Sequence, residues 1–476
     1  MNCSTTEWSL TTAAYAHQRA AVEKLSRLKV GGLFMDMGTG KTRTAIELVW
    51  LRRHRISMCV WFCPVSLMET ARREILKHTT CTDADIHVFG PKTRESSLPK
   101  VFWYIVGIES IGSSARVVCT LDKLIDEKAF IVVDESTFIK GHRAKRTKRL
   151  TLLGARTAYR LILTGTPITQ GIEDLYSQMM FLSPKILDYH SWYTFRRHHI
   201  EFSHGHKGLI VGRYDKDIVY QRIAPYVYEV MKKDCLDLPP KTYQQMWCSF
   251  SDEQKRLYEA VKERFYEDLE EYDPAETGVA VYRLFSGLHS VSCGVRPAGF
   301  IGEKSLENGR VESVTNMLRC IKDTHVIVWV NYLESVYALR ESFGASLPHR
   351  NVYELRGNLS PKMRTENVDC WKRYGGILLA TQGTGGHGLT LTESAYALFF
   401  SDGWKYSDRL QAEDRCHRIG QTRNVYYLTI RCDCGLDKRI GLSLSRKADA
   451  LTELKEEVAK LNGDRNEIKK LVESTL

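Results

Sequence analysis

Short apolar runs that end in turn residues recur along the chain, with longer amphipathic stretches between them. Runs rich in β-branched and aromatic residues predict buried strands, and the amphipathic stretches between them predict helices. The predicted strands are residues 31–36, 58–63, 102–108, 130–134, 160–164, 325–330 and 425–430, of which residues 325–330 are expected to start a second sheet. This alternation predicts an α/β protein.

The strand pattern breaks at Leu238-Pro239-Pro240-Lys241, where two adjacent prolines disfavour a helix and mark a linker. We therefore place one domain in residues 1–235, a second in residues 236–445 and a helical tail in residues 446–476. The tail has two amphipathic helices, broken at Asn462-Gly463, which we expect to pack on the rest of the chain. The predicted helical insertion of the second domain is residues 251–272, and residues 273–310 show no readable pattern.

Composition adds a polyanionic partner to this picture. The 476 residues exceed one ordinary core, and 43% hydrophobic with 26% charged residues is typical of a soluble globular protein. The net charge of +11 suits nucleic acid. The 13 cysteines include no Cys-x-x-Cys pair, so we expect buried, reduced thiols rather than a zinc site or disulfides. Residues 1–12 are polar and no apolar run has membrane-spanning length, so we expect a soluble, intracellular protein of the cytoplasm or nucleoid.

A strand, a glycine turn and a helical pattern follow one another near the start of the chain. The turn is Met37-Gly38-Thr39-Gly40-Lys41-Thr42, directly after the strand of residues 31–36. In this context Lys41 would reach the β- and γ-phosphates of ATP, and the Thr42 hydroxyl would hold Mg²⁺. Met35 stands where such loops usually carry their first glycine, so an ordinary glycine-rich turn remains an alternative until a second motif is found.

The second motif is Phe130-Ile131-Val132-Val133-Asp134-Glu135, a buried strand that ends in two carboxylates. Ligand sites of open α/β sheets lie at the carboxyl edge of the strands. Asp134 would hold Mg²⁺, and Glu135 would accept the proton of the attacking water. An Asp-Glu pair at a strand end is by itself usually the start of a loop. Together with the phosphate loop, it predicts a site for nucleotide hydrolysis.

Two arginines near the other end of the chain complete the candidate chemistry. Residues 411–421 contain Arg415 and Arg418, which on a helix would share one face, one turn apart. Guanidinium groups stay charged and match phosphate oxygens. Read alone, the segment could equally be a solvated basic helix face, because the spacing does not say which phosphate it meets.

The order of these motifs resembles that of ATP-dependent double-stranded DNA translocases of the Swi/Snf type, within helicase superfamily two, over residues 13–445. Residues 411–421 match that family's final motif, Gln-Ala-x-Asp-Arg-x-His-Arg-x-Gly-Gln, at every fixed position. The resemblance implies two RecA-like lobes in tandem, each a doubly wound parallel sheet with helices on both faces and helical insertions, with ATP between them. Arg415 and Arg418 would complete the ATP site from the second lobe.

The resemblance also assigns roles to residues outside these motifs. Gln18 would read the adenine edge, and Gly388 belongs to a glycine turn that would approach the nucleotide. The residues implied to contact nucleic acid, or to couple hydrolysis to movement between the lobes, are Pro64, Ser66, Thr164, Thr166, Arg364, Thr381, Gln382 and Gln411.

The chain departs from the family directly after Glu135. The family has a small residue followed by histidine, whereas this chain has Ser136 and Thr137. The metal and base roles survive this change, while the link between the nucleotide and lobe closure lacks its usual residue.

Two basic stretches leave alternative interpretations open. Residues 142–149 indicate a solvated helix face, with a nucleic-acid patch as the alternative. Residues 192–199 mix aromatic and basic side chains, which is typical of nucleic-acid binding and equally of a helix that packs its aromatics inward.

The resemblance implies a motor that hydrolyses ATP to translocate along double-stranded DNA and to remodel DNA or protein–DNA complexes. We expect a monomer with sequence-independent, salt-sensitive binding to phosphates. The C-terminal tail is the candidate site for a protein partner. The alternatives are a strand-separating DNA or RNA helicase of repair, recombination or replication, a non-catalytic DNA-binding scaffold, and a P-loop small-molecule kinase. Retention of Lys41, Asp134 and Glu135 argues against the scaffold, and the kinase leaves residues 411–421 unexplained.

Overall fold

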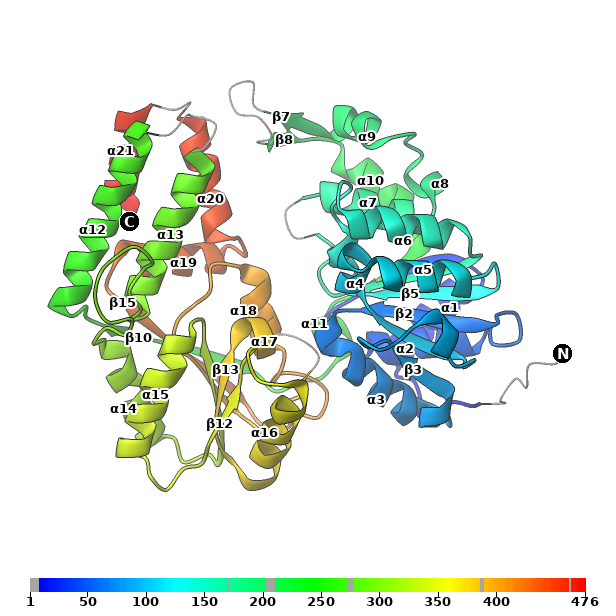
Figure 1. Cartoon of the computed structure of the whole chain (residues 1–476), viewed down its shortest axis with the longest axis horizontal. Coiled ribbons are helices and arrows are strands. Elements are labelled where there is room, and N and C mark those ends of the chain that lie inside the picture. Colours follow the sequence, from blue (N-terminus) through cyan, green and yellow to red (C-terminus); the bar gives the residue numbers. More distant parts are fainter. Residues whose placement is uncertain (1–7, 169–170, 203–209, 272–276, 386–388, 462–463) are drawn as a thin grey trace. The chain divides into compact units, whose positions relative to one another are not determined.

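The computed structural model describes residues 8–168, 171–202, 210–271, 277–385, 389–461 and 464–476 (Figure 1). Contacts between residues divide the chain into two compact units, and the main part of the second runs from Leu238 to Leu476. The boundary between Asp237 and Leu238 directly precedes the two prolines of the linker, which lie in unit 2. Each unit has its own parallel sheet.

Unit 1 is built on a seven-stranded parallel sheet in the order β3-β4-β2-β5-β6-β1-β9. Its strands are β1 (Val30–Met35), β2 (Met58–Cys63), β3 (Ile86–Val88), β4 (Trp103–Gly107), β5 (Ala129–Asp134), β6 (Tyr159–Thr164) and β9 (Val227–Val230). Consecutive residues of β2 and β5 are buried, so both faces of the sheet are covered. The five strands that apolar runs predict in this unit are confirmed.

Helices connect these strands and cover the sheet. They are α1 (Ala16–Ser26), α2 (Lys41–Trp50), α3 (Met68–His78), α4 (Ile108–Ser113), α5 (Ala115–Leu124), α6 (Lys145–Ala155), α7 (Glu173–Leu182), α8 (Pro184–Leu187), α9 (Trp192–His199), α10 (Lys216–Ile223) and α11 (Lys232–Cys235). A two-stranded sheet of β7 (Ile200–Phe202) and β8 (Ile210–Arg213) follows α9.

The two basic stretches lie on helices of unit 1. In α9, Phe195 and His199 are buried while Tyr193 is 64% exposed, so this helix packs part of its aromatic content inward. In α6, Arg149 donates a hydrogen bond to the carbonyl of Ile111 (2.7 Å), which shows that part of this basic charge is used within the unit.

Unit 2 contains a six-stranded parallel sheet in the order β10-β15-β14-β11-β13-β12. Its strands are β10 (Lys241–Cys248), β11 (His325–Val330), β12 (Val352–Leu355), β13 (Gly376–Thr381), β14 (Tyr396–Phe399) and β15 (Val425–Cys432). The prediction that residues 325–330 start this sheet is wrong, because β10 enters it first. Most side chains of β10 are exposed, since it is an edge strand, and so it lacks the apolar run that marks a buried strand.

Both faces of the second sheet are covered, as expected. The helices of unit 2 are α12 (Asp252–Glu271), α13 (Thr277–Ser292), α14 (Gly309–Cys320), α15 (Leu333–Ser346), α16 (Pro361–Tyr374), α17 (Gln382–Gly385), α18 (Tyr406–Glu413), α19 (Gly435–Ser445), α20 (Ala450–Lys460) and α21 (Arg465–Thr475). In β11, Val326 and Val328 belong to a core shared with α14 and α15. Ile327 and Trp329 belong to another core shared with α16 and α18.

The tail packs within unit 2. Helices α12, α13, α19, α20 and α21 share a hydrophobic core that includes Leu257, Phe285, Leu454 and Val472 (Figure 1). The predicted helix over residues 251–272 and the predicted packing of the tail are confirmed. The apolar sides of α20 and α21 are used in this core, and a protein partner at the tail stays a prediction.

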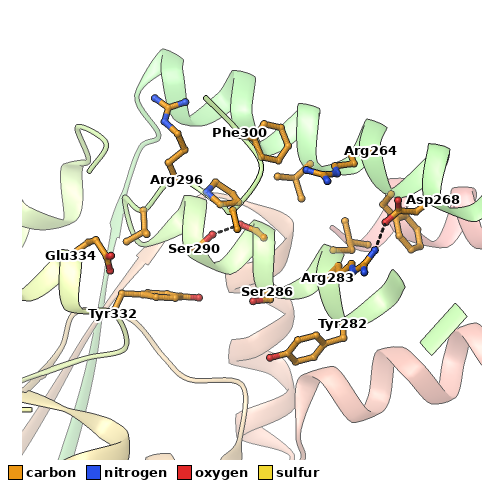
Figure 2. Close-up of a pocket in the computed structure, with 17 residues that line it drawn as sticks. Arg264, Asp268, Tyr282, Arg283, Ser286, Ser290, Arg296, Phe300, Tyr332 and Glu334 are labelled. Atoms are coloured by element: carbon orange, nitrogen blue, oxygen red, sulfur yellow. Dashed lines mark hydrogen bonds and ion pairs between the residues drawn. The ribbon is translucent and has the colours of Figure 1, made fainter. Parts of the chain in front are cut away.

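A pocket of about 560 Å³ opens between α12, α13 and the segment that follows α13 (Figure 2). Three arginines, Arg264, Arg283 and Arg296, line it. Arg283 lies 3.8 Å from the carboxylate of Asp268, and Arg296 pairs with Glu253. Within the stretch that shows no readable pattern in the sequence, residues 277–292 form α13, and residues 295–298 and 300 form part of the pocket wall.

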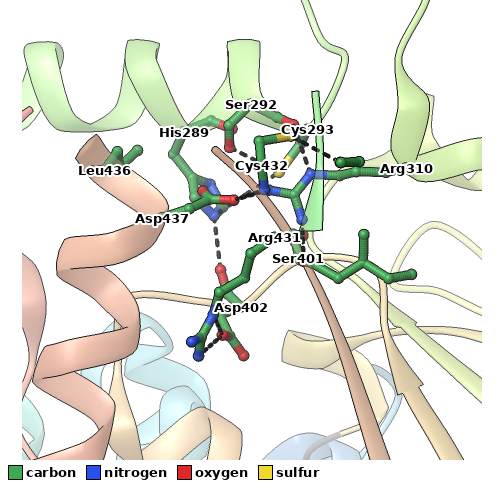
Figure 3. Close-up of polar contacts among 12 residues, drawn as sticks. His289, Ser292, Cys293, Arg310, Ser401, Asp402, Arg431, Cys432, Leu436 and Asp437 are labelled. Carbon is green, nitrogen blue, oxygen red and sulfur yellow. Dashed lines mark hydrogen bonds and ion pairs between the residues drawn. The ribbon is translucent and has the colours of Figure 1, made fainter. Parts of the chain in front are cut away.

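A fully buried arginine ties the helices of unit 2 to its sheet. Arg310 of α14 pairs with the carboxylate of Asp437 in α19 (Figure 3). Its guanidinium also donates hydrogen bonds to the carbonyls of Ser292 (2.8 Å) and Phe400 (2.6 Å). The same carboxylate oxygen of Asp437, Oδ2, also accepts a hydrogen bond from the backbone N–H of Cys432 (2.7 Å). Each charge of this buried pair is thus satisfied by groups from several elements.

We expect Asp437→Asn to lower the free energy of unfolding of unit 2 by about 3–5 kcal/mol, because Arg310 would keep a buried charge without its counter-ion. Urea denaturation followed by tryptophan fluorescence measures the loss. The control within unit 2 is Asp433→Asn, which breaks an exposed ion pair with Lys438 and should leave the free energy of unfolding nearly unchanged. Equally small losses for both variants would contradict the role of the buried pair.

Candidate active site

Three neighbouring strands of unit 1 end at one edge of the sheet. Strands β5, β6 and β1 are adjacent and parallel, so the segments after them meet at the carboxyl edge. These segments are the turn at Asp134-Glu135, the turn at residues 164–167 and the loop at residues 37–40. The structure therefore brings together the residues predicted to hold phosphate and metal.

The phosphate loop has the geometry that its glycines predict. Gly38 and Gly40 have φ angles of 81° and 88°, which favour glycine, and α2 begins at Lys41. With Gly40 as N-cap, no side chain caps the free N–H groups of the first turn of α2, an arrangement that suits an anion. The predicted order of strand, glycine turn and helix is confirmed.

The side chain of Lys41 lies over the end of β1. Its Nζ donates hydrogen bonds to the carbonyls of Met35 (2.8 Å) and Asp36 (3.2 Å). Thr39 is buried, and its hydroxyl donates to the same Asp36 carbonyl (2.7 Å). Met35, which stands where the first glycine is usual, thus contributes a carbonyl that orients the ammonium group.

Gln18 of α1 is bound to the phosphate loop. Its Nε2 donates to the carbonyl of Thr39 (3.0 Å), and its Oε1 accepts from the N–H of Tyr15 (3.0 Å). A Cβ on Gly40 would lie 2.1 Å from Gln18 Nε2, so a glycine is required there. The structure places Gln18 beside the loop, and its contact with adenine stays a prediction.

Asp134 and Glu135 follow β5 with an unusual backbone. Glu135 has a φ of 51°, in the left-handed region, and its N–H donates to Oδ1 of Asp134 (3.0 Å). Burial and the Glu135 carboxylate raise the pKa of Asp134 to about 7, while Lys41 acts in the opposite direction. A divalent cation would favour the ionised carboxylate. Asp134 and the hydroxyl of Thr42, the second residue of α2, are oxygen ligands of the kind that Mg²⁺ takes.

The turn after β6 packs against the phosphate loop. Thr164 is buried, and its hydroxyl accepts a hydrogen bond from the N–H of Thr166 (3.1 Å). A Cβ on Gly165 would lie 3.3 Å from both Lys41 Nζ and the backbone nitrogen of Met37. A side chain added at Gly165 would therefore press on the phosphate loop.

The segment after β2 also lies at this edge. Pro64 is buried, whereas Ser66 is exposed at the surface. The backbone N–H of the intervening Val65 donates to Oε2 of Glu109 (3.0 Å), in the first turn of α4. Of the two predicted DNA contacts, Ser66 is thus the one whose side chain is accessible.

Arg415 and Arg418 belong to unit 2, and the prediction that they share a helix face is wrong. Helix α18 ends at Glu413, and both arginines lie in the turns that follow it. Each donates from Nη1 to the carbonyl of Leu389 (3.3 Å in both cases), so their guanidinium groups converge on one atom. Tertiary contact, rather than helical spacing, brings the two side chains together.

Residues 414–421, which contain Arg415 and Arg418, are called the arginine segment below. A chain of buried charges holds its start. Arg409 pairs with Asp402 and with Glu413 (2.9 Å), and its guanidinium lies 3.4 Å from the ring centroid of Phe399. Asp402 also pairs with Arg431 (2.8 Å). Burial alone raises the pKa of Asp402, but Arg409 and Arg431 outweigh it and hold that pKa below its usual value.

The arginine segment is also tied to the linker and β10. His417 Nε2 lies 2.8 Å from the carbonyl oxygen of Pro239, and the hydroxyl of Tyr243 donates to Glu413 (2.8 Å). Gln421 donates from Nε2 to the carbonyl of Ser394 (3.0 Å) and so closes the segment at its other end. Its conformation is therefore set by contacts from several parts of unit 2.

The other predicted residues of unit 2 lie on separate elements. Arg364 is in α16, and its Nε is buried without a hydrogen-bond partner among the described residues. Thr381 ends β13, and the buried Gln382 donates to the carbonyl of Ser401 (3.0 Å). Gln411 lies in α18. Gly388 lies outside the described residues.

Several polar residues that shape these segments were not predicted from the sequence. Asp402 and Tyr243 match no spacing pattern with Arg431 and Glu413, because these partners are distant in the sequence. The spacing of Arg409 four residues before Glu413 is a helix pattern that could have drawn attention to it. Gln178 lies in α7 and is fully buried, with the acidic turn and the turn after β6 as its neighbours. A polar residue within the apolar run of α7 is the signal that could have drawn attention to it.

A family model described as the SNF2-related domain matches residues 17–288, more than half of the chain. The chain therefore belongs to the SNF2-related family. A second model, the helicase conserved C-terminal domain, matches residues 309–420 of this SNF2-related chain. The expected resemblance is confirmed.

Several curated proteins are similar to the SNF2-related chain. The TATA-binding protein-associated factor mot1 of Schizosaccharomyces pombe is 25% identical over 92% of the chain and 26% of its own length. An uncharacterized ATP-dependent helicase of Mycoplasma pneumoniae is 22% identical over 88% of the chain and 40% of its own length. The chromatin structure-remodeling complex subunit snf21 of Schizosaccharomyces pombe is 24% identical, over 88% and 37%. The chain thus spans well under half the length of these relatives.

A solved structure of the Sulfolobus solfataricus SWI2/SNF2 ATPase core in complex with double-stranded DNA is 23% identical to the SNF2-related chain. It covers 97% of each chain with a TM-score of 0.43. Within the residues that the structure describes, no helix is both long and apolar enough to cross a bilayer.

We expect Gly165→Ala to weaken binding of a non-hydrolysable ATP analogue about tenfold, or about 1.4 kcal/mol. The added methyl group would press on Lys41 Nζ and on the loop backbone at 3.3 Å. Calorimetric titration measures the affinity. Gly90→Ala is the matched control, since a Cβ there meets nothing within 4 Å. An unchanged affinity in Gly165→Ala would refute the steric contact.

Proposed function

We propose that the protein is an ATP-driven motor that translocates along double-stranded DNA and remodels DNA or protein–DNA complexes. The observation that supports the proposal most strongly is the meeting of the Lys41 loop and the Asp134-Glu135 turn at one sheet edge, in a chain of the SNF2-related family. Lys41, the glycines and the open end of α2 suit a triphosphate, and a carboxylate beside them suits its hydrolysis.

The residues of unit 1 divide the chemistry between them. Lys41 and the N–H groups at the start of α2 bind and orient the phosphates. Thr42 and Asp134 hold Mg²⁺, which when bound neutralises phosphate charge. Glu135 accepts the proton of the attacking water. Its backbone is left-handed, with a φ of 51°, so the chain turns sharply at Glu135 directly after β5.

The arginines of unit 2 complete the proposed site. Arg415 and Arg418 supply positive charge to the γ-phosphate. An arginine in this role typically raises the rate of hydrolysis by about 10³–10⁵-fold. Their shared contact with the Leu389 carbonyl keeps the two guanidinium groups together before they meet phosphate.

Duplex DNA is the proposed track. The net charge of +11 favours a polyanion, and contacts to backbone phosphates give binding without sequence preference. Ser66 in unit 1 and Arg364 and Gln411 in unit 2 are the proposed contacts or coupling residues, with Thr164, Thr166, Thr381 and Gln382. We further propose that the protein acts inside the cell, as a monomer.

Strand separation is the second candidate function. It is supported by the similarity to a protein of Mycoplasma pneumoniae named as an ATP-dependent helicase. A forked duplex and a triplex together distinguish the two functions. A translocase displaces the third strand of the triplex and leaves the fork paired, whereas a helicase separates the strands of the fork.

Phosphate release should rise strongly with duplex DNA and much less with single-stranded DNA or RNA of equal length. The stimulation should weaken steeply between 50 and 200 mM salt, about the range over which phosphate contacts lose affinity. Steady-state assays with each nucleic acid, and with none, test the proposal. A preference for single strands would favour the helicase function, and no hydrolysis under any condition would refute both.

Glu135→Gln should leave ATP binding intact and lower turnover by at least about 10²-fold, because the amide cannot accept the proton of water. Binding is followed by calorimetry and turnover by phosphate release. Glu127→Gln is the control, an exposed glutamate near the opposite end of the same strand, and should behave as the wild type. Substantial turnover in Glu135→Gln would exclude its role as general base.

A further inference from the structure

Ser136, directly after the acidic pair, makes a short buried hydrogen bond. Its hydroxyl donates to Oε1 of Gln178 in α7 over 2.6 Å. Both side chains are fully buried, so water does not compete for the bond. The residue next to the proposed general base is thus bound to a helical residue 42 positions further along the chain.

The amide of Gln178 continues the contact to the turn after β6. Its Nε2 donates to the carbonyl of Pro167 (3.0 Å) and to the carbonyl of Asp174 (2.8 Å) in the preceding turn of its own helix. Oxygen and nitrogen of one planar amide therefore face the two turns at the same time. A shift of either turn must strain or break a bond to the other.

A second contact holds the same elements together. Lys140, at the end of the short helical turn over Ser136–Ile139, pairs with the carboxylate of Asp174 at 3.4 Å. Because this ion pair also attaches the short helical turn to α7, the distance between Ser136 and Gln178 is restrained from both sides.

We infer that Gln178 is a positioning residue that couples the acidic turn to the Thr164–Pro167 turn. It does so through Ser136, in a chain where Thr137 replaces the histidine that its resemblance to the Swi/Snf type leads one to expect. The inference rests on the proposed function. When a phosphate or metal moves Asp134 and Glu135, the movement is transmitted through Ser136 and Gln178 to Pro167. From Pro167 it reaches Thr164 and Thr166 of the same turn.

The test is a double-mutant cycle of Ser136→Ala, Gln178→Met and the combined variant. Ser136→Ala removes one hydroxyl with little change of volume, and Gln178→Met keeps the length of the side chain without its amide. Each single variant should lower the ratio of duplex-stimulated to unstimulated turnover about three- to tenfold, with the KM for ATP little changed. The combined variant should lose no more than the worse single variant, because one relay is broken in each.

A readout without hydrolysis separates this inference from the proposed function. In the wild type, a non-hydrolysable ATP analogue should slow amide hydrogen exchange in a peptide covering residues 161–168. In Gln178→Met the analogue should still bind, with that protection lost. If the wild type hydrolyses no ATP but shows the protection, the proposed function fails and the relay stands.

Ser177→Ala is the matched control. Ser177 neighbours Gln178 in α7 and is buried, and its hydroxyl has no hydrogen-bond partner among the described residues. This variant should match the wild type in stimulation and in exchange. The inference is overturned if Ser136→Ala and Gln178→Met retain full stimulation and protection, if their losses multiply in the combined variant, or if the losses follow the melting temperature.

Discussion

Parallel hydrogen bonding between β5, β6 and β1 is the constraint on which the candidate site depends. Three parallel strands deliver their carboxyl ends to one edge, so an acidic turn, a threonine turn and a phosphate loop meet without any direct connection in sequence. The close approach of Gly165 to the phosphate loop follows from the register of β6 beside β1. One slip of that register would separate the lysine from the turn that it contacts.

Unit 2 achieves precision by a different means, the pairing of buried charges. Arg310 pairs with Asp437 (Figure 3) and Arg409 pairs with Asp402, and none of these buried charges can be left unpaired without a large penalty. These pairs contribute specificity of position more than net stability. The arginine segment after α18 is held by turn hydrogen bonds, such as that from the Cys416 N–H to the Glu413 carbonyl (3.2 Å), rather than by a continuous helix, so its shape also depends on such contacts.

The relay through Gln178 shows how a departure from a family motif can be accommodated by the fold. A buried amide offers a donor and an acceptor in fixed directions, and can therefore join two turns as a single side chain. Ser136 is small enough to leave room for it. The chemistry of the acidic turn and its connection to the neighbouring turn are then carried by separate residues.

Much of the fold and the core of the site could be read from the sequence, because both depend on local patterns. Apolar runs predict the buried strands, glycines predict the phosphate loop, and the two acids at the end of the apolar run of β5 predict the acidic turn. Edge strand β10 escaped detection because its exposed side chains carry no apolar signal. The helix expected at Arg415 and Arg418 ends at Glu413, and their convergence on Leu389, like the contacts of Gln178, arises between residues distant in sequence. The sequence by itself determined which residues are candidates for the chemistry, whereas only the tertiary structure decided their partners, because buried polar groups must be satisfied by whatever groups the packing brings to them.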